Sequence, residues 1–172
     1  MKLLHSMLVK VFAEDLDGYD KYWSIRSMYS NFSIIKQFQS YLWRRLMARF
    51  GAYIPLNTDI ARDVKFPHGI GGVFISEGAS IGSGCTIFQQ VTIGSNTLED
   101  SPRKGAPSVG NSCYIGCGAK IIGNVNVGNN VRIGANCVIV EDVPDNCTVV
   151  LSKPQVIYHE NVRNNSYRQW NQ

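Results

Sequence analysis

The chain has 172 residues, of which 44% are hydrophobic and 17% charged, a balance typical of one compact domain and unlike a disordered chain. Its formal charge of +4 is small and forms no dense basic stripe, which argues against a nucleic-acid-binding protein. The five cysteines contain no CxxC pair, so the sequence predicts neither a zinc site nor a disulfide framework and favours a reducing compartment.

Residues 1–53 lack the repeat that follows them and are predicted to form a short helical segment. The first ten residues faintly resemble a secretion signal, but His5 and Lys10 interrupt the apolar stretch. We therefore expect a cytoplasmic protein. Residues 32–42 show an amphipathic helical pattern, with Asn31 as a candidate N-cap and Gly51 as a candidate stop.

The favoured role of this segment is to cover the open end of the domain that follows. The alternative is a weak peripheral contact with an anionic membrane surface. The residues available for that contact are Lys36, Arg44, Arg45 and Arg49, together with Trp43 and Phe50.

Residues 54–153 carry a repeat six residues long. Isoleucine or valine anchors ten regular units: Ile75, Ile81, Ile87, Ile93, Val109, Ile115, Ile121, Val127, Ile133 and Ile139. Four residues after each anchor stands a small or β-branched residue: Ala79, Cys85, Val91, Thr97, Cys113, Ala119, Val125, Val131, Cys137 and Val143. Fainter units begin at Ile54, Ile60 and Phe66.

A period of six excludes an α-helix, because six residues make 1.67 helical turns and would scatter the anchors around the axis. A strand of two or three residues followed by a tight turn accommodates the period. Each anchor then points into a prism, where its burial contributes about 1.5–3 kcal/mol, and the residue four positions later fills a corner. The sequence therefore predicts a parallel solenoid whose coils stabilise one another.

The interval between Ile93 and Val109 holds ten residues more than one unit. We expect residues 94–108, which contain glycine, proline and charges, to leave the coil as an extruded loop. Such loops on a rigid scaffold are often functional. Residues 154–172 are expected to form a C-terminal tail.

Three motifs accompany the repeat: His-x-x-Gly at 68–71, Ile-Gly-Cys-Gly-Ala-Lys at 115–120 and Ile-Gly-Ala-Asn at 133–136. With them, residues 57–150 resemble the hexapeptide-repeat acyltransferases, in particular the serine acetyltransferase branch. The resemblance implies a mainly β fold, the left-handed parallel β-helix, which is an exception to the usual handedness of parallel crossovers. It also implies acetyl-CoA as cosubstrate, no metal, and a homotrimer with active sites between neighbouring subunits.

Counting the repeat predicts that four residues, one from each successive coil, line a single corner of the prism: His68, Gln89, Cys117 and Ala135. His68 occupies the position of the family's catalytic histidine, and an imidazole is the natural general base at neutral pH. Gln89 and Gln90 are candidate substrate contacts, although plain turn polarity explains them equally well.

The resemblance assigns the contacts with CoA to turns on the same corner, where glycine leaves backbone N–H groups accessible. The residues concerned are Gly116, Cys117, Gly118, Ala135 and Asn136. Lys153, beside Pro154 after the last coil, is a candidate for the 3′-phosphate of CoA, with an ordinary solvated lysine as the other interpretation.

Two anchors of the serine pocket are missing. Pro67 stands where the family has Asp, and Gly105-Ala106 stand where its loop has Arg-His before a proline, here Pro107. In these departures and in its short helical segment, the chain resembles the short O-acetyltransferases of polysaccharide and surface-glycan biosynthesis. This resemblance implies acetylation of a sugar hydroxyl, with serine O-acetylation in cysteine biosynthesis as the alternative. A carbonic anhydrase of this fold would need three ligating histidines, and a structural or ice-binding solenoid would show threonine ladders; neither pattern is present.

Overall fold

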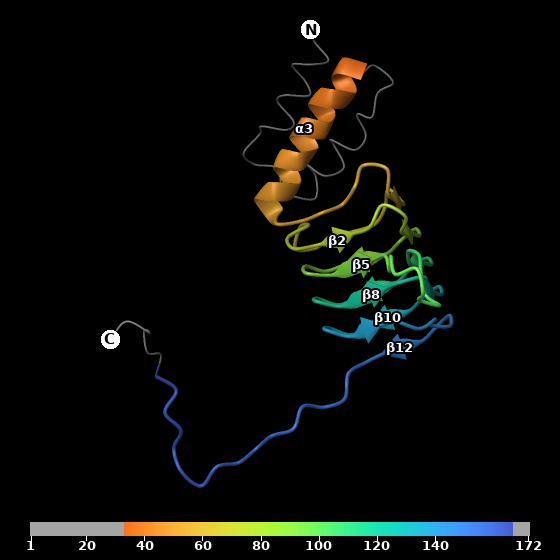
Figure 1. The fold of residues 1–172 in the computed structure, drawn as a ribbon. Coiled ribbons are helices and arrows are strands. Elements are labelled where there is room, and N and C mark those ends of the chain that lie inside the picture. The colour runs from red at the N-terminus through yellow and green to blue at the C-terminus, as the bar shows by residue number, and fades with distance from the viewer. Residues whose placement is uncertain (1–32, 167–172) are drawn as a thin grey trace.

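The computed structural model of the protein describes residues 33–166, in which one helix precedes a column of short strands (Figure 1). The helix is α3 (Ser33–Phe50). The strands are β1 (Asp59–Ile60), β2 (Phe74–Ile75), β3 (Ser80–Ile81), β4 (Thr86–Ile87), β5 (Thr92–Gly94), β6 (Ser108–Val109), β7 (Tyr114–Ile115), β8 (Lys120–Ile122), β9 (Asn126–Val127), β10 (Arg132–Ile133), β11 (Val138–Ile139) and β12 (Thr148–Val149).

Consecutive strands belong to different sheets, so the chain winds around a three-sided prism. The three parallel sheets have the orders β1-β3-β6-β9, β4-β7-β10-β12 and β2-β5-β8-β11. Each sheet therefore contains one strand from each successive coil. The predicted fold class, a mainly β left-handed parallel β-helix with a short helical segment and an extruded loop, is confirmed.

The interior of the prism is a single stack of the predicted anchors. All ten regular anchors and the three fainter ones, Ile54, Ile60 and Phe66, are buried. The predicted corner residues are buried as well, except that Val143 is half-buried and Thr97 is exposed. The expectation for Thr97 was wrong because the coil is interrupted after Gly94, which puts Thr97 in the loop rather than at a corner.

Helix α3 covers the open first coil (Figure 1). Its inner face buries Leu42, Trp43, Leu46 and Met47, and the Trp43 indole donates a hydrogen bond to the Ile54 carbonyl at 2.7 Å. The covering role is therefore confirmed. Trp43 is 5% exposed and is not available to a membrane, so its part in the alternative interpretation was wrong.

Three of the cationic residues named for that contact, Arg44, Arg45 and Arg49, are exposed. The side chain of Lys36 lies outside the described part of the structure. Gly51 ends the helix as predicted, with a left-handed φ of 55° that favours glycine. Asn31 lies outside the described residues. Among the described helices, none is long and apolar enough to span a bilayer.

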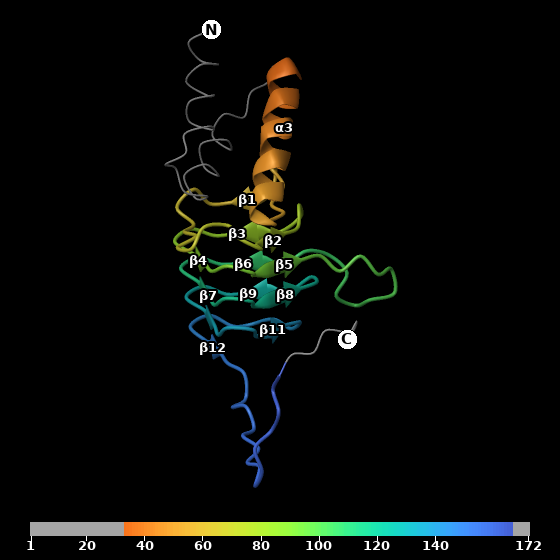
Figure 2. The ribbon, with the colours of Figure 1, turned by 90° about the vertical axis from the view of Figure 1, so that its left-hand side faces the viewer.

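The loop between β5 and β6 projects from the side of the prism (Figure 2). The Asn96 and Gly105 backbones exchange two hydrogen bonds, of 2.8 and 2.9 Å, and so close its base. Beyond β12, residues 150–166 contain no helix or strand. The loop is thus an insertion that leaves the coils above and below it in contact.

The inward and outward sides of one strand should differ sharply in their contribution to stability. Ile121 is fully buried, and its neighbour Ile122 is half-buried on the outer face. We expect Ile121→Ala to lower the free energy of unfolding by about 2–5 kcal/mol and the matched control Ile122→Ala to lower it by about 1 kcal/mol or less. Denaturant titrations followed by circular dichroism provide the measurement, and equal losses would contradict the packing described.

Candidate active site

His68 is presented by a tight turn that follows the first coil's strand-like residue Lys65. The Gly69 N–H donates to the Phe66 carbonyl at 2.9 Å, which closes a four-residue turn with Pro67 at its second position. Proline favours that position because its φ is fixed near the value the turn needs. The buried side chain of Phe66 anchors the start of the turn in the core. Gly69 has a left-handed φ of 69°, which lets the chain change direction at the end of the turn. The His68 side chain between them is exposed to solvent.

The strand pairing brings the four predicted residues to one corner. Lys65 pairs with Thr86, Thr86 with Tyr114, and Tyr114 with Arg132. His68, Gln89, Cys117 and Ala135 each follow these paired residues by three positions. Gly118 N–H donates to the Gln89 carbonyl at 3.0 Å, and Asn136 N–H donates to the Cys117 carbonyl at 2.9 Å. The predicted register of this column is confirmed.

The imidazole of His68 is held by contacts from the next coil. Its Nδ1 lies 2.8 Å from the Oε1 atom of Gln89. Phe88 packs edge-on against the ring, with centroids 5.3 Å apart, and Tyr114 in turn lies 5.0 Å from Phe88. With the amide oxygen of Gln89 facing the ring, the contact fits the Nδ1–H tautomer, in which the Nε2 lone pair is left for chemistry.

The glycines of the third coil are required by the stacking itself. A Cβ on Gly116 would lie 2.7 Å from the Ala135 nitrogen, and one on Gly118 would collide with the Asn136 side-chain oxygen. Gly118 and Asn136 also have left-handed φ values of 69° and 59°. Part of the glycine-rich pattern at 116–118 is therefore structural.

Three residues near this corner were missed by sequence reasoning. Phe88 contacts the histidine ring, and Tyr114 packs behind Phe88. Lys120 lies on β8, where its Nζ donates to the Gly118 carbonyl at 2.7 Å and the Gln90 carbonyl at 3.4 Å. The repeat count already put Phe88 next to Gln89, and this adjacency was the available signal. Lys120 brings a positive charge to the same corner.

Two further predicted site residues, Gln90 and Lys153, lie outside the column of His68, Gln89, Cys117 and Ala135. Gln90 neighbours it and is exposed, with φ 62°. Lys153 is exposed in the segment after β12 and belongs to no described element. The structure therefore gathers Gln89, Gln90 and the turns of 116–118 and 135–136 around His68, while Lys153 follows the last coil.

The His68 column precedes the strands of the sheet β2-β5-β8-β11, whereas the extruded loop follows β5. The loop therefore lies at the opposite ends of these strands, at another corner of the prism. Two ion pairs stabilise it: Arg103 with Asp142 at 2.8 Å, and Lys104 with Glu99 at 2.6 Å. The Asn126 backbone N–H, and then Arg103, hold the pKa of Asp142 below its usual value. Within one chain, the loop and His68 thus occupy two different edges of one sheet.

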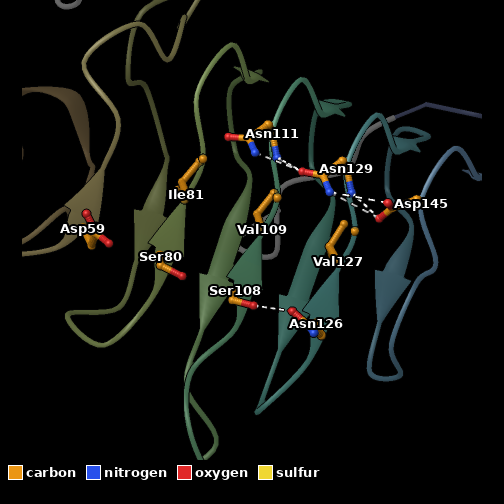
Figure 3. A pocket seen from close by; sticks show the side chains of 13 residues that line it. Asp59, Ser80, Ile81, Ser108, Val109, Asn111, Asn126, Val127, Asn129 and Asp145 are labelled. Carbon is orange, nitrogen blue, oxygen red and sulfur yellow. Dashed lines mark hydrogen bonds between the residues drawn. The ribbon is translucent and has the colours of Figure 1, made fainter.

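A polar groove of about 470 Å³ runs along another face of the prism, the sheet β1-β3-β6-β9 (Figure 3). Side chains from successive coils hydrogen-bond along it: the Asn111 N–H donates to Asn129 Oδ1 at 2.8 Å, and the Asn129 N–H donates to Asp145 Oδ1 at 2.7 Å. These contacts satisfy turn backbone groups between coils. None of the predicted site residues lines the groove, so it is separate from the His68 corner.

The cysteines of the described region are all unpaired. Cys85, Cys113 and Cys137 are buried, whereas Cys117 and Cys147 are partly accessible. The Cys85 thiol hydrogen-bonds to Cys113 and lowers the pKa of Cys113 to about 7, while that contact and burial raise the pKa of Cys85. Within residues 33–166, no group of three or more His, Cys, Asp or Glu side chains could hold a metal ion.

Known proteins share this arrangement of coils. Residues 106–141 match the family model for the bacterial transferase hexapeptide (six repeats). A serine acetyltransferase of Synechococcus elongatus is 38% identical over 130 residues, which are 76% of this chain and 51% of that protein. The resemblance to serine acetyltransferases is confirmed. The chain spans about half the length of this relative.

Solved structures agree with the sequence comparison. Serine acetyltransferase isoform 3 from Entamoeba histolytica, in complex with cysteine, matches with a TM-score of 0.70 and 27% identity over 92% of this chain and 61% of that chain. A serine acetyltransferase in complex with CoA matches with a TM-score of 0.61 and 28% identity over 76% of this chain and 52% of that chain.

Proposed function

We propose that this protein transfers an acetyl group from acetyl-CoA to a hydroxyl, with His68 as the general base. The observation that carries the proposal is the contact of His68 Nδ1 with Gln89 Oε1 at 2.8 Å, which leaves Nε2 as the available base beside a glycine-rich corner. The similarity to serine acetyltransferases over three quarters of the chain supports the same chemistry.

In the proposed reaction, Nε2 accepts the proton of the acceptor hydroxyl while the oxygen attacks the thioester carbonyl. The tetrahedral intermediate collapses, the carbon–sulfur bond breaks, and the CoA sulfur leaves with the proton returned by the imidazolium. The N–H groups of Gly116, Gly118 and Asn136 already donate to backbone carbonyls. The proposed donors for the developing oxyanion are therefore the N–H groups of Cys117 and Ala135 in the same turns. The step needs no metal.

The proposed binding site for acetyl-CoA follows the corner past His68. Cys117 and Ala135 have small side chains there, so an extended pantetheine arm would contact the backbone rather than large side chains. The turns that carry them are completed by Gly116, Gly118 and Asn136. Lys120 and Lys153 are the proposed partners of the CoA phosphates. The structural neighbour in complex with CoA supports this ligand.

For the acceptor, the comparisons favour the alternative. The sugar-hydroxyl expectation finds no support, because the relative and both structures described above are serine acetyltransferases. We therefore propose L-serine as the acceptor, despite Pro67 and Gly105-Ala106 at the positions of the family's charged anchors. Pro67 shapes the turn that presents His68, so its presence has a structural reason independent of substrate choice.

The proposed partner of the serine carboxylate is a cation of the extruded loop. Arg103 and Lys104 are engaged in ion pairs whose side chains are 41–86% exposed. Exposed pairs of this kind contribute about 0–1 kcal/mol, so exchanging one carboxylate partner for another costs little. Because loop and His68 lie at two edges of one sheet, we propose a homotrimer in which the loop of one subunit approaches His68 of the next.

If CoA occupies the proposed corner, it should shield one thiol selectively. Cys117 and Cys147 are the partly accessible cysteines of the described region, and Cys147 lies at a different corner. We expect CoA at saturating concentration to slow alkylation of Cys117 by at least about tenfold. At a CoA concentration about 100 times its dissociation constant, few protein molecules have an empty site whose thiol can react. Mass spectrometry of iodoacetamide-treated protein measures both sites. Equal protection of Cys147, the internal control, or no protection of Cys117 would contradict the site.

Replacing the proposed base should reduce turnover without removing the CoA site. We expect His68→Ala to lower kcat by about 10²–10⁴-fold, the usual contribution of a general base, with CoA affinity changed less than threefold. The matched control is His159→Ala, which changes the other described histidine, exposed beyond the last coil. Release of thiol from acetyl-CoA measures turnover, and near-normal rates in His68→Ala would exclude this role.

The acceptor is tested by comparing compounds that differ in one group. We expect kcat/KM for L-serine of about 10⁴ M⁻¹s⁻¹ or more, the lower end of the usual enzyme range. L-serine amide should be a poorer substrate because it lacks the carboxylate, and L-alanine gives the hydrolysis background. A sugar acceptor that is turned over faster than serine, in a panel of mono- and oligosaccharides, would overturn the proposed substrate while leaving the acetyl transfer intact.

A further inference from the structure

We propose that Gln89 is the positioning residue of His68, holding the imidazole as the Nδ1–H tautomer through a neutral amide where a carboxylate would serve in most histidine bases. This inference rests on the proposed function of His68. It gives Gln89 a role different from the substrate contact expected from the sequence.

The geometry supports a positioning role because Gln89 is fixed by its own backbone. Its carbonyl accepts the Gly118 N–H at 3.0 Å, and the next residue, Gln90, donates its N–H to the Gly71 carbonyl at 3.0 Å. Gln89 is therefore held between the coil that carries His68 and the coil below. Its side chain is half-buried, while the imidazole that it meets is exposed.

The ring is confined on a second side by Phe88, whose edge-on contact has an interplanar angle of 81°. A hydrogen bond at Nδ1 and an aromatic wall together restrict rotation about both side-chain torsions of His68. Misplacing a catalytic group by about 1 Å costs up to about 10²-fold in rate. The contact with Gln89 thus acts on the rate through the orientation of His68.

A neutral amide orients the ring without placing a negative charge beside it. Among residues 33–166, no carboxylate hydrogen-bonds to His68 and no ion pair includes it. The ionisable groups on the surrounding elements include Lys65 in the same coil, Tyr114 behind Phe88, and Cys117 and Lys120 two coils further along. The carboxylate of Asp63, in the coil of His68, accepts hydrogen bonds from Ser83 and Gly84. A carboxylate in place of the amide would favour the imidazolium, which is the form of a histidine that cannot act as a base.

Two substitutions at Gln89 separate orientation from charge. Gln89→Ala removes the acceptor, and Gln89→Glu keeps an acceptor at the same reach and adds a negative charge. The matched control is Gln37→Glu, the same change at an exposed position of α3, which contributes no residue to the corner. Histidine-selective ¹⁵N NMR reports the tautomer, and the chain has three histidines to assign.

We expect the wild-type protein and Gln37→Glu to show Nδ1–H at His68 near neutral pH, and Gln89→Ala to shift toward the Nε2–H form. Gln89→Ala should lose about 10²-fold in kcat with KM for acetyl-CoA unchanged. Gln89→Glu should restore the Nδ1–H tautomer and most of kcat, and should move the midpoint of the pH–rate profile upward by about one pH unit.

The two proposals fail in different ways. If the protein turns over no acceptor, the function proposed above fails, and the tautomer measurement still decides the role of Gln89. If Gln89→Ala keeps the wild-type tautomer and rate, or if Gln89→Glu leaves the pH midpoint where Gln37→Glu has it, Gln89 does not position His68, whatever the acceptor is.

Discussion

Backbone hydrogen bonding between successive coils is the constraint on which the whole molecule depends. Each strand is only two or three residues long and is stable only because the strands above and below it are in register. That register fixes which residue lies above which. It forces isoleucine and valine inward at every level, small residues into the corners, and glycine wherever two turns approach, as at Gly116 against the Ala135 backbone.

The same constraint explains how the extruded loop is tolerated. The chain leaves the coil after Gly94 and returns at Ser108, and the paired backbones of Asn96 and Gly105 close the gap. The Gly123 N–H still reaches the Gly94 carbonyl at 2.9 Å, so the coil below keeps its partner. An insertion that is closed at its base can vary in sequence without disturbing the stack, which makes this loop a suitable carrier of acceptor specificity.

The corner that carries His68 combines rigidity with openness. Its residues come from consecutive coils, so their spacing is set by the strand separation and not by flexible loops. The amide of Gln89 and the ring of Phe88 contact the imidazole, and Tyr114 packs behind Phe88. The turns in the coils below carry the small side chains of Cys117 and Ala135. Acyl transfer from a thioester requires a base held in a fixed position, and the stacked coils provide that rigidity. The charged groups that would recognise an amino acid lie at another edge, which is the physical reason for proposing a site shared between subunits.

By itself, the six-residue period determined a parallel solenoid, because it excludes an α-helix, and counting along it places His68, Gln89, Cys117 and Ala135 together. The left-handed form of the solenoid came from the resemblance to a known family. The sequence could not show how the side chains of the column meet: that Gln89 contacts Nδ1, that Phe88 covers the ring, and that Lys120 turns toward the corner follow from side-chain packing across coils. It also counted Thr97 among the corner residues although the predicted loop, residues 94–108, includes it. The alternative that gave Trp43 to a membrane was wrong because the docking of α3 is not encoded in the period. Periodicity specifies which residues share a level and a face, whereas contacts between side chains far apart in the chain arise only when the coils are stacked.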